Sequence, residues 1–388
     1  MGAGAYRIRV GGATANRRLV GLMAAVLLLI CGQVPQATAA RWKPQVGLPE
    51  WWDTDARGRG PARIILLYNS GGMPAWTVDR LRYYISHVTA DGTPDHWFFD
   101  TVLVLALTGE SQRSFEPNYG KGPALAEDWQ QYLDGRLFSG LSELAALEKA
   151  VHEANARLGG SSHVVRVIIS IPYPDPRATE FGTVEGKALN FSRAEDRAEA
   201  VRWYLREVSR RWSASQFEHL RLGGFYWVRE EVPASDDNLL KLVSGLVGRQ
   251  LLPFYWIPYF GSEGSRKWQE LGFDVAIQQP NYFFYDVPPE RIDEAARFAR
   301  EHRMGVEIEM DRRVVNSPER RERYESYLNG GVDQGYLYSG TLAWYDDAAL
   351  LECGQSKDPA VRRLYDATYR FVSGKYRKQL PNDARIEK

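Results

Sequence analysis

The chain of 388 residues carries 49 Lys and Arg against 49 Asp and Glu, so its formal net charge is zero. No basic surplus is available to neutralise a phosphate backbone, and we therefore exclude nucleic acid as a partner. The 6 His and 2 Cys are scattered, with no HExxH, HxH or Cys/His pair, so the sequence predicts no metal site. No GxGxxG pattern follows a strand, and no cofactor is expected.

Residues 1–39 predict a signal peptide. Four arginines precede an apolar run, Leu19–Ile30, which is too short for a comfortable membrane span. Ala37-Thr38-Ala39 matches a small-x-small cleavage site, so we expect the mature chain to begin at Ala40. The prediction is an exported protein, periplasmic or secreted, without a stable membrane span after cleavage. An uncleaved N-terminal anchor is the alternative, and the export route stays open between the general and the twin-arginine pathways.

The rest of the chain predicts one large domain, residues 62–375, between a lead-in segment (40–61) and a polar tail (376–388). Short stretches rich in β-branched and aromatic residues, bounded by Gly, Pro and polar residues, predict strands. In chain order they are 63–70, 99–108, 164–172, 222–230, 252–259, 273–282, 305–311 and 333–340.

Amphipathic stretches at helical spacing lie between these strands. They are 76–88, 140–158, 192–212, 235–248, 266–271, 288–302 and 318–329, and a last one, 358–375, follows the final strand. Strand and helix alternating in this way predict an α/β fold, a single-domain (β/α)8 TIM barrel, better than an open doubly wound sheet. The segments after strands two and three, 109–125 and 173–191, predict long loops at the carboxyl face, where barrel active sites form.

Strand seven carries acids at alternate positions, Glu307, Glu309 and Asp311. Since successive side chains of a strand point to opposite faces, these acids share one face and the apolar residues between them share the other. The apolar face packs on the helices, which sends the carboxylates into the barrel. Burying like charges is costly unless they are paired, protonated or functional. Function is favoured over the alternative, in which the acids pair with a buried Arg229.

Strand four ends in Glu230 and Glu231, and alternation points Glu230 inward. Two carboxylates across a barrel mouth suit glycoside hydrolysis, in which one protonates the leaving oxygen and the other attacks or stabilises the anomeric carbon. Strands four and seven commonly hold this pair in retaining enzymes. By that analogy Glu230 is the acid/base and Glu309 the nucleophile, although Glu307 or Asp311 could take the second role.

Polar and aromatic side chains accumulate at the same strand ends and offer neutral donors, acceptors and stacking faces to a sugar. The predicted substrate-binding residues are Tyr68, Asn69, Glu231, Trp256, Tyr259, Gln279, Asn281, Tyr282, Glu307, Asp311 and Tyr338.

Four segments, 224–230, 254–259, 272–282 and 305–311, resemble motifs of an uncharacterised bacterial family, domain of unknown function 4855. The resemblance extends from about Pro61 to Lys375 and implies a barrel related to glycoside hydrolases. It implies Glu230 and Glu309 as site residues and no particular sugar. In many retaining barrels an Asn precedes the acid/base, whereas here that residue is Arg229.

The sequence therefore favours an exported glycoside hydrolase that acts on a polysaccharide or oligosaccharide, with a retaining mechanism preferred. The alternative is a non-catalytic barrel that binds polysaccharide at the cell envelope, which would not need both Glu230 and Glu309 near one glycosidic oxygen. A metal-dependent deacetylase or an esterase is disfavoured, because neither histidine ligands nor a serine elbow is found.

Overall fold

The computed structural model describes residues 62–159, 163–337 and 340–378. The predicted signal peptide, the lead-in segment and Tyr338 lie outside the described residues. The chain divides into two units, Met1–Gly47 and Leu48–Lys388, and all described residues belong to the second.

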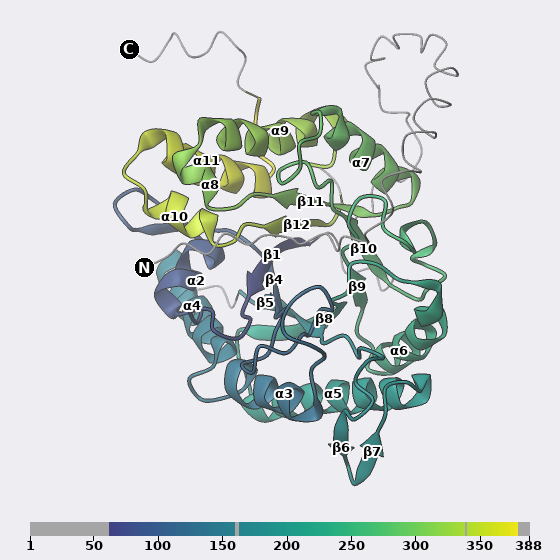
Figure 1. Ribbon diagram of the computed structural model, residues 1–388. Helices are drawn as coiled ribbons and strands as arrows, with labels where there is room; N and C mark the ends of the chain where they lie inside the picture. The colour runs from purple at the N-terminus through teal and green to yellow at the C-terminus, as the bar shows by residue number, and fades with distance from the viewer. Residues whose placement is uncertain (1–61, 160–162, 338–339, 379–388) are drawn as a thin grey trace, which may run out of the picture. The chain divides into compact units, whose positions relative to one another are not determined.

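Eight parallel strands close into a barrel in the order β1-β12-β11-β10-β9-β8-β5-β4, with helices around the outside (Figure 1). The TIM-barrel prediction is confirmed. The strands are β1 (Arg63–Tyr68), β4 (Thr101–Leu105), β5 (Val165–Ile171), β8 (Leu220–Trp227), β9 (Phe254–Trp256), β10 (Val275–Gln278), β11 (Gly305–Glu309) and β12 (Leu342–Tyr345).

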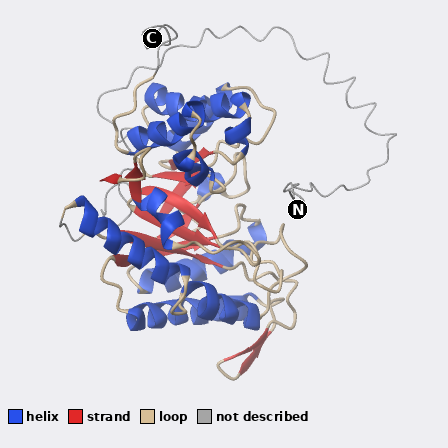
Figure 2. Ribbon diagram, turned by 90° about the vertical axis from the view of Figure 1, so that its left-hand side faces the viewer, coloured by secondary structure: helices blue, strands red, loops and turns tan. Residues whose placement is uncertain are grey.

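Most predicted helices are present and cover the barrel, and Figure 2 shows helices on both sides of the strands. They are α2 (Val78–Ile85), α4 (Glu143–Leu158), α5 (Ala194–Ser215), α6 (Asp237–Arg249), α7 (Glu290–Glu301), α9 (Pro318–Gln334) and α11 (Pro359–Val372). The predicted helix 266–271 is wrong, because the segment forms only a 3-10 turn, Ser265–Lys267. Short helices that were not predicted are α3 (Ala126–Gln131), α8 (Arg313–Asn316) and α10 (Ala349–Gln355), with a π-helical turn at Tyr132–Leu137.

The eighth strand was predicted in the wrong place. Helix α9 continues through Gly330 and Gly331 to Gln334, and the last barrel strand is Leu342–Tyr345. The two glycines do not end the helix; they let it pack closely on its neighbours. A Cβ at Gly331 would lie 2.3 Å from Cζ of Phe371, and one at Gly330 would lie 2.7 Å from Cγ2 of Ile292.

Strand β8 contains a bulge that bears on the site at its carboxyl end. Its register with β5 pairs Val167 with Leu222 and Ile168 with Gly224, so Gly223 is an extra residue. Gly224 has φ +152°, and a Cβ there would lie 2.6 Å from the carbonyl oxygen of Pro253. Only glycine fits this close approach, after which the chain runs on to Glu230.

The long loops predicted after strands two and three are confirmed. The loop between β4 and α3 folds back on itself, since Phe115 N–H donates to the Leu107 carbonyl at 2.8 Å. The loop after β5 carries a hairpin of β6 (Gly182–Val184) and β7 (Lys187–Leu189). A second hairpin, β2 (Ser86–Val88) and β3 (Pro94–Trp97), lies between α2 and β4. It therefore precedes β4, at the end of the barrel opposite to the carboxyl ends of the strands.

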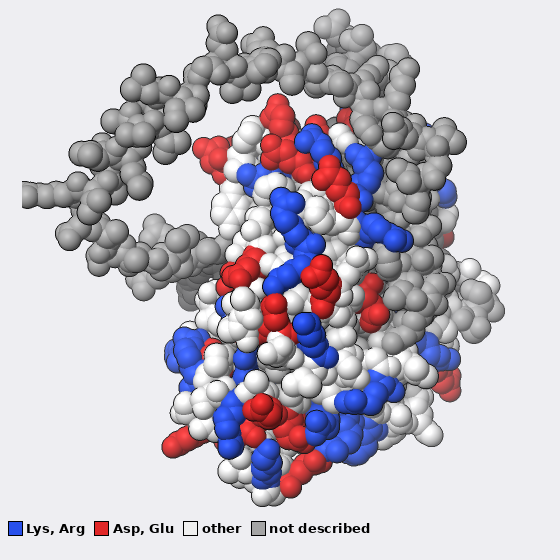
Figure 3. Space-filling view, turned by 90° about the vertical axis from the view of Figure 1, so that its right-hand side faces the viewer, with Lys and Arg blue, Asp and Glu red and all other residues white. Residues whose placement is uncertain are grey.

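None of the described helices is both long and apolar enough to cross a membrane. Lys and Arg side chains are interspersed with Asp and Glu over the face drawn in Figure 3, so no large patch of one charge covers that face.

Candidate active site

The two acids of β11 point into the barrel, as alternation predicted. The side chains of Glu307 and Glu309 are 3% and 1% exposed. Val306 and Ile308, which alternate with them, are fully buried in the apolar core. Burial raises the pKa of both carboxyls, and mutual repulsion adds to the effect on Glu307.

Glu309 has more hydrogen-bond partners than Glu307, because three protein donors reach its carboxyl oxygens. Tyr327 on α9 donates its hydroxyl to Oε2. Asn281 donates its backbone N–H to Oε1 at 3.1 Å and its side-chain amide to the same oxygen at 3.3 Å. Hydrogen bonds to a carboxylate favour its ionised form, so they oppose the effect of burial on the pKa of Glu309.

Asn281 holds this arrangement through an unusual backbone conformation. Its φ is +54°, in the left-handed region that Asn tolerates better than most residues. The amide orientation is set by Phe260, whose N–H donates to Oδ1 of Asn281 at 2.7 Å. The amide nitrogen is therefore left to donate to Glu309 and, at 2.9 Å, to Oε1 of Gln279.

Glu230 lies opposite, just beyond the end of β8. Burial raises its pKa to about 7, the amide of Gln279 opposes the rise, and the charges of Glu309 and Glu231 add to it. Gln279 is itself fixed, because its amide nitrogen donates to the Ile257 carbonyl at 3.0 Å. Glu230 and Glu309 are thus close enough to repel each other, and they differ in the number of donors that face them.

Glu231 belongs to a separate ion pair. Its Oε1 accepts from Nη2 of Arg229 at 2.9 Å and its Oε2 accepts from the hydroxyl of Tyr259 at 2.9 Å. Arg229 also donates to the hydroxyl of Tyr173 at 2.7 Å and stacks on that ring. The hydrogen bond from Arg229 lowers the pKa of Glu231. Arg229 therefore neutralises Glu231 and not the acids of β11, which was the alternative considered from the sequence.

A further carboxylate, Glu116, was missed by the sequence analysis. It lies in the long loop after β4 and is 4% exposed. Burial raises its pKa to about 7; the Asn118 N–H opposes the rise and the charge of Glu230 adds to it. Asn118 donates its backbone N–H to Oε2 at 2.7 Å. The Phe-Glu-Pro-Asn turn that holds Glu116 has no strand periodicity, so only its position in a long mouth loop could have suggested it.

A family of uncharacterised proteins has the same sequence pattern. The model of the family described as "Domain of unknown function (DUF4855)" matches residues 63–370, from the first barrel strand into the last helix. The chain belongs to this family. The resemblance noted in its motifs is therefore confirmed.

No curated protein matches this DUF4855 protein. Among solved structures it is similar to a "putative alpha-L-fucosidase" from Bacteroides thetaiotaomicron, with 12% identity, a TM-score of 0.46, and 86% of this chain and 99% of that chain covered. It is also similar to the tryptophan synthase complex from Pyrococcus furiosus, with 14% identity, a TM-score of 0.38, and 83% of this chain and 99% of that chain covered.

Two predicted binding residues of the DUF4855 protein are buried and engaged away from the site carboxylates. Trp256 is fully buried, stacks on Phe273 at 5.0 Å and donates its indole N–H to the Arg229 carbonyl. Asn69 is fully buried and is occupied by Glu143 and Tyr132. For these two side chains the structure leaves no free face for a ligand.

Two other predicted residues lie at the edge of the site. The ring of Tyr282 is buried beneath the guanidinium of Arg323, at 4.6 Å. Asp311 lies beyond the end of β11 and forms a salt bridge with Arg313 at 2.8 Å. Both side chains are thus engaged by arginines.

Three tyrosines border the acids. Tyr68, a predicted binding residue, lies near Glu230 and Glu307. Burial raises the pKa of Tyr68, and the charges of the two glutamates raise it further. Tyr345 on β12 packs edge-on against Tyr68 at 5.3 Å. Tyr285, in the loop after β10, is 48% exposed, and its pKa is raised by burial and then by Glu230 and Glu309. Tyr285 thus offers an exposed ring beside both acids.

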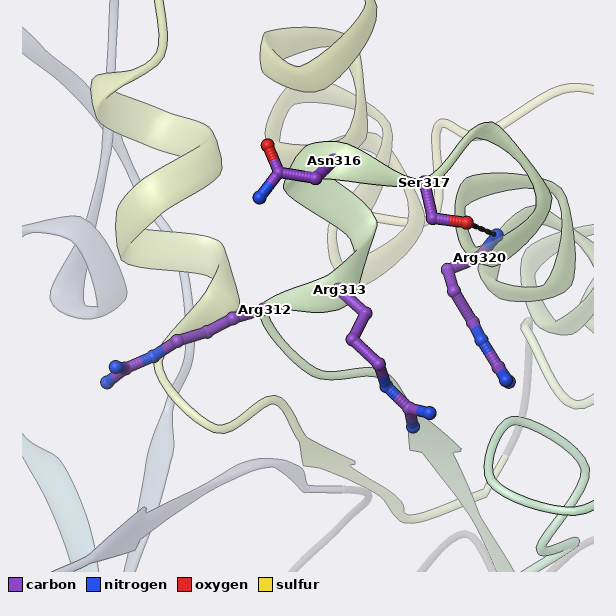
Figure 4. A pocket seen from close by; sticks show the side chains of 5 residues that line it. All are labelled: Arg312, Arg313, Asn316, Ser317 and Arg320. Atoms are coloured by element: carbon purple, nitrogen blue, oxygen red, sulfur yellow. Dashed lines mark hydrogen bonds between the residues drawn. The ribbon is translucent and has the colours of Figure 1, made fainter. Parts of the chain in front are cut away.

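A cavity of about 430 Å³ lies between α8 and α9, lined by Arg312, Arg313, Asn316, Ser317 and Arg320. In Figure 4 the side chains of Arg313 and Arg320 point the same way, whereas Arg312 points away from them. Arg320 also donates to the carbonyl of Phe283, whose N–H donates to the hydroxyl of Tyr327 at 3.0 Å. A chain of hydrogen bonds therefore runs from Arg320 at the cavity through the backbone of Phe283 and the hydroxyl of Tyr327 to Glu309.

Proposed function

We propose that this protein is an exported glycoside hydrolase that cleaves a polysaccharide or oligosaccharide with Glu230 and Glu309 as its catalytic pair. The observation that carries the proposal is the chain of amides between the two acids: Asn281 donates to Glu309 and to Gln279, and the amide of Gln279 faces Glu230. Glycoside hydrolysis requires two such carboxyl groups, one protonated and one ionised. Export rests on the signal sequence alone.

The unequal surroundings of the two acids support a division of roles. Burial raises the pKa of both Glu230 and Glu309 to about 7, so either carboxyl can hold a proton in weakly acidic solution. Glu309 accepts hydrogen bonds from Tyr327 and Asn281, which favour its ionised form. The larger number of donors at Glu309 therefore favours Glu309 as the ionised member of the pair and leaves the proton on Glu230.

In the mechanism that follows, Glu230 donates its proton to the glycosidic oxygen as the bond to the anomeric carbon breaks. Glu309 attacks that carbon and forms a glycosyl ester. Glu230, now ionised, then removes a proton from the water that hydrolyses the ester, which restores both carboxyl groups. The exposed ring of Tyr285 offers an apolar face for a sugar next to the reacting bond.

The test is the release of new reducing ends from a panel of polysaccharides by the wild-type protein, Glu230→Gln and Glu309→Gln. We expect activity of the wild type on one substrate class and losses of about 10²–10⁴-fold in both variants. Glu301→Gln is the matched control, because Glu301 is exposed on α7, outside the barrel mouth.

Full activity in both Gln variants would contradict the proposed pair. Binding of a polysaccharide by the wild type without any release of reducing ends would favour the binding barrel instead. For an active substrate, the anomer that forms first, followed by proton NMR, distinguishes retention from inversion.

A further inference from the structure

We infer that the β2–β3 hairpin carries a divalent transition-metal site, with Zn²⁺ as its cation and His87, Asp95 and His96 as its ligands. The nitrogen and oxygen atoms that these side chains offer all lie within 4.8 Å of one another. The hairpin precedes β4, at the opposite end of the barrel from Glu230 and Glu309. The inference is therefore independent of the proposed hydrolase activity.

The pairing of the hairpin brings the two histidines together. His87 on β2 and His96 on β3 are directly opposite in the antiparallel register. Asp95 is the neighbour of His96, and its Oδ1 lies 2.7 Å from Nδ1 of His87 and 3.2 Å from Nδ1 of His96. Ligands at 2.0–2.1 Å from a tetrahedral ion are about 3.3 Å apart, so small shifts would centre an ion between the three atoms.

A second carboxylate supports the outer side of His87. Its Nε2 lies 3.0 Å from Oδ1 of Asp366 on α11, and Arg362 donates to the same oxygen at 2.9 and 3.0 Å. Histidine ligands of metals commonly donate their other ring N–H to a carboxylate, which fixes the tautomer that leaves the first nitrogen free for the metal. Asp366 would fix Nδ1 of His87 in this way.

The ring of His87 is also held rigidly. It is 8% exposed and stacks on Tyr369 at 4.3 Å and on Tyr365 at 5.3 Å. His96 is 54% exposed and packs near Tyr369 at 5.4 Å. One ligand is thus preorganised in the protein and the other two face solvent, where an ion and a completing water can enter.

The ligand types select the metal. Two imidazoles and one carboxylate suit Zn²⁺ and its neighbours in the transition series, whereas Mg²⁺ and Ca²⁺ prefer oxygen ligands alone. An ion here would join the two strands of the hairpin, and the hydrogen bond between His87 and Asp366 connects the site to α11. Because an ion that binds only the folded chain stabilises it, we expect Zn²⁺ to raise the Tm of the protein.

The experiment is titration of the metal-free mature protein with ZnCl₂ by calorimetry, together with the visible spectrum of the Co²⁺-loaded protein. We expect one ion per chain, a tetrahedral Co²⁺ spectrum, and no binding of MgCl₂. His96→Ala, whose side chain is exposed, should abolish both signals without changing the thermal unfolding of the metal-free protein. Asp366→Asn should weaken binding about 10–100-fold.

His152→Ala is the matched control, because Nδ1 of His152 lies 3.2 Å from Nε2 of His219 in a second histidine pair. This variant should bind Zn²⁺ as the wild type does. The inference is overturned if the wild type binds no Zn²⁺, if His96→Ala binds it with unchanged affinity, or if His152→Ala loses the binding.

Discussion

The hydroxyl of Tyr327 on α9 donates a hydrogen bond to Glu309 on β11. The same hydroxyl oxygen accepts the backbone N–H groups of Tyr282 and Phe283, each at 3.0 Å. One phenol therefore joins three parts of the barrel: the helix, the strand and the loop after β10. Its place between two N–H donors and a carboxylate polarises the O–H toward Glu309.

Tyr327→Phe should lower kcat on the proposed substrate about 10–100-fold, since a hydrogen bond to a charged group contributes about 1.5–3 kcal/mol. The acid limb of the pH–rate profile should also move to higher pH, because the ionised form of Glu309 loses a donor. Rates measured across the pH range check this. An unchanged acid limb with a lower Tm would show that Tyr327 acts through stability alone.

The pH–rate profile of the wild type should be narrow. Glu230 must hold a proton, so activity falls as the pH rises through its pKa of about 7. Glu309 must be ionised, and burial raises its pKa, so activity falls toward acid from a higher pH than for an exposed glutamate. The profile of kcat/KM reports both groups in the free protein. A plateau that extends well above pH 8 would contradict the role of Glu230.

The variant Glu307→Gln tests which of the two acids of β11 reacts with the substrate. Burial and then the charges of Glu309 and Glu230 raise the pKa of Glu307, which favours its protonated form, so its neutral isostere should preserve most of the activity. Glu309→Gln should not. If Glu307→Gln loses activity as completely as Glu309→Gln, the roles within β11 are assigned wrongly.

The variant Glu307→Gln also tests how the stability of the protein depends on pH. A carboxyl whose pKa is raised by folding binds its proton more tightly in the folded state, so its contribution to stability is complete below its unfolded pKa of about 4.5. That contribution is lost as the pH rises through the folded value. The pKa values of the buried carboxyls of Glu116 and Glu230 are likewise raised to about 7. We therefore expect the Tm to fall as the pH rises from about 4.5 to 7. Glu307→Gln should make this fall shallower; a steeper fall would contradict it.

The alternation of side chains along a strand was the rule that identified site residues from the sequence. It placed Glu307 and Glu309 inside the barrel. The same rule excludes Trp256, because Tyr255 pairs with Tyr226, which lies near Glu230 and Glu307, whereas Trp256 pairs with Trp227 on the other face. Aromatic character alone had suggested Trp256 as a sugar platform. A large ring on the outer face of a strand is instead part of the packing against the helices.

Glu116, His87 and His96 could not be found in that way. Glu116 is positioned by a loop whose shape depends on contacts with other loops, and a loop has no periodicity to read. The sequence spacing of His87 and His96 matches no metal-binding motif, and the two side chains meet only because the hairpin pairs their strands. The misplaced eighth strand has a similar origin, since the glycines at the end of α9 are explained by the side chains of other helices.

Tyr285→Ala should raise KM for the proposed substrate while leaving kcat less affected, because Tyr285 is exposed beside Glu230 and Glu309 and contributes binding surface. Trp256→Phe is the comparison: Trp256 is fully buried, so this change should lower the Tm and leave KM unchanged. Steady-state kinetics and thermal unfolding of both variants check this pair. An unchanged KM in Tyr285→Ala would remove Tyr285 from the binding surface.

Gly331→Ala tests the explanation of the displaced eighth strand. The added Cβ would lie 2.3 Å from Cζ of Phe371 and 2.8 Å from Cε2 of Tyr336, both buried, and overpacking of this kind costs about 1–3 kcal/mol. Gly245→Ala on α6 is the matched control, because nothing lies within 4 Å of its added Cβ. There the higher helix propensity of Ala should stabilise the protein by up to about 1 kcal/mol. Denaturant unfolding should therefore shift in opposite directions for the two variants, and equal shifts would mean that close helix packing is not why Gly331 is needed.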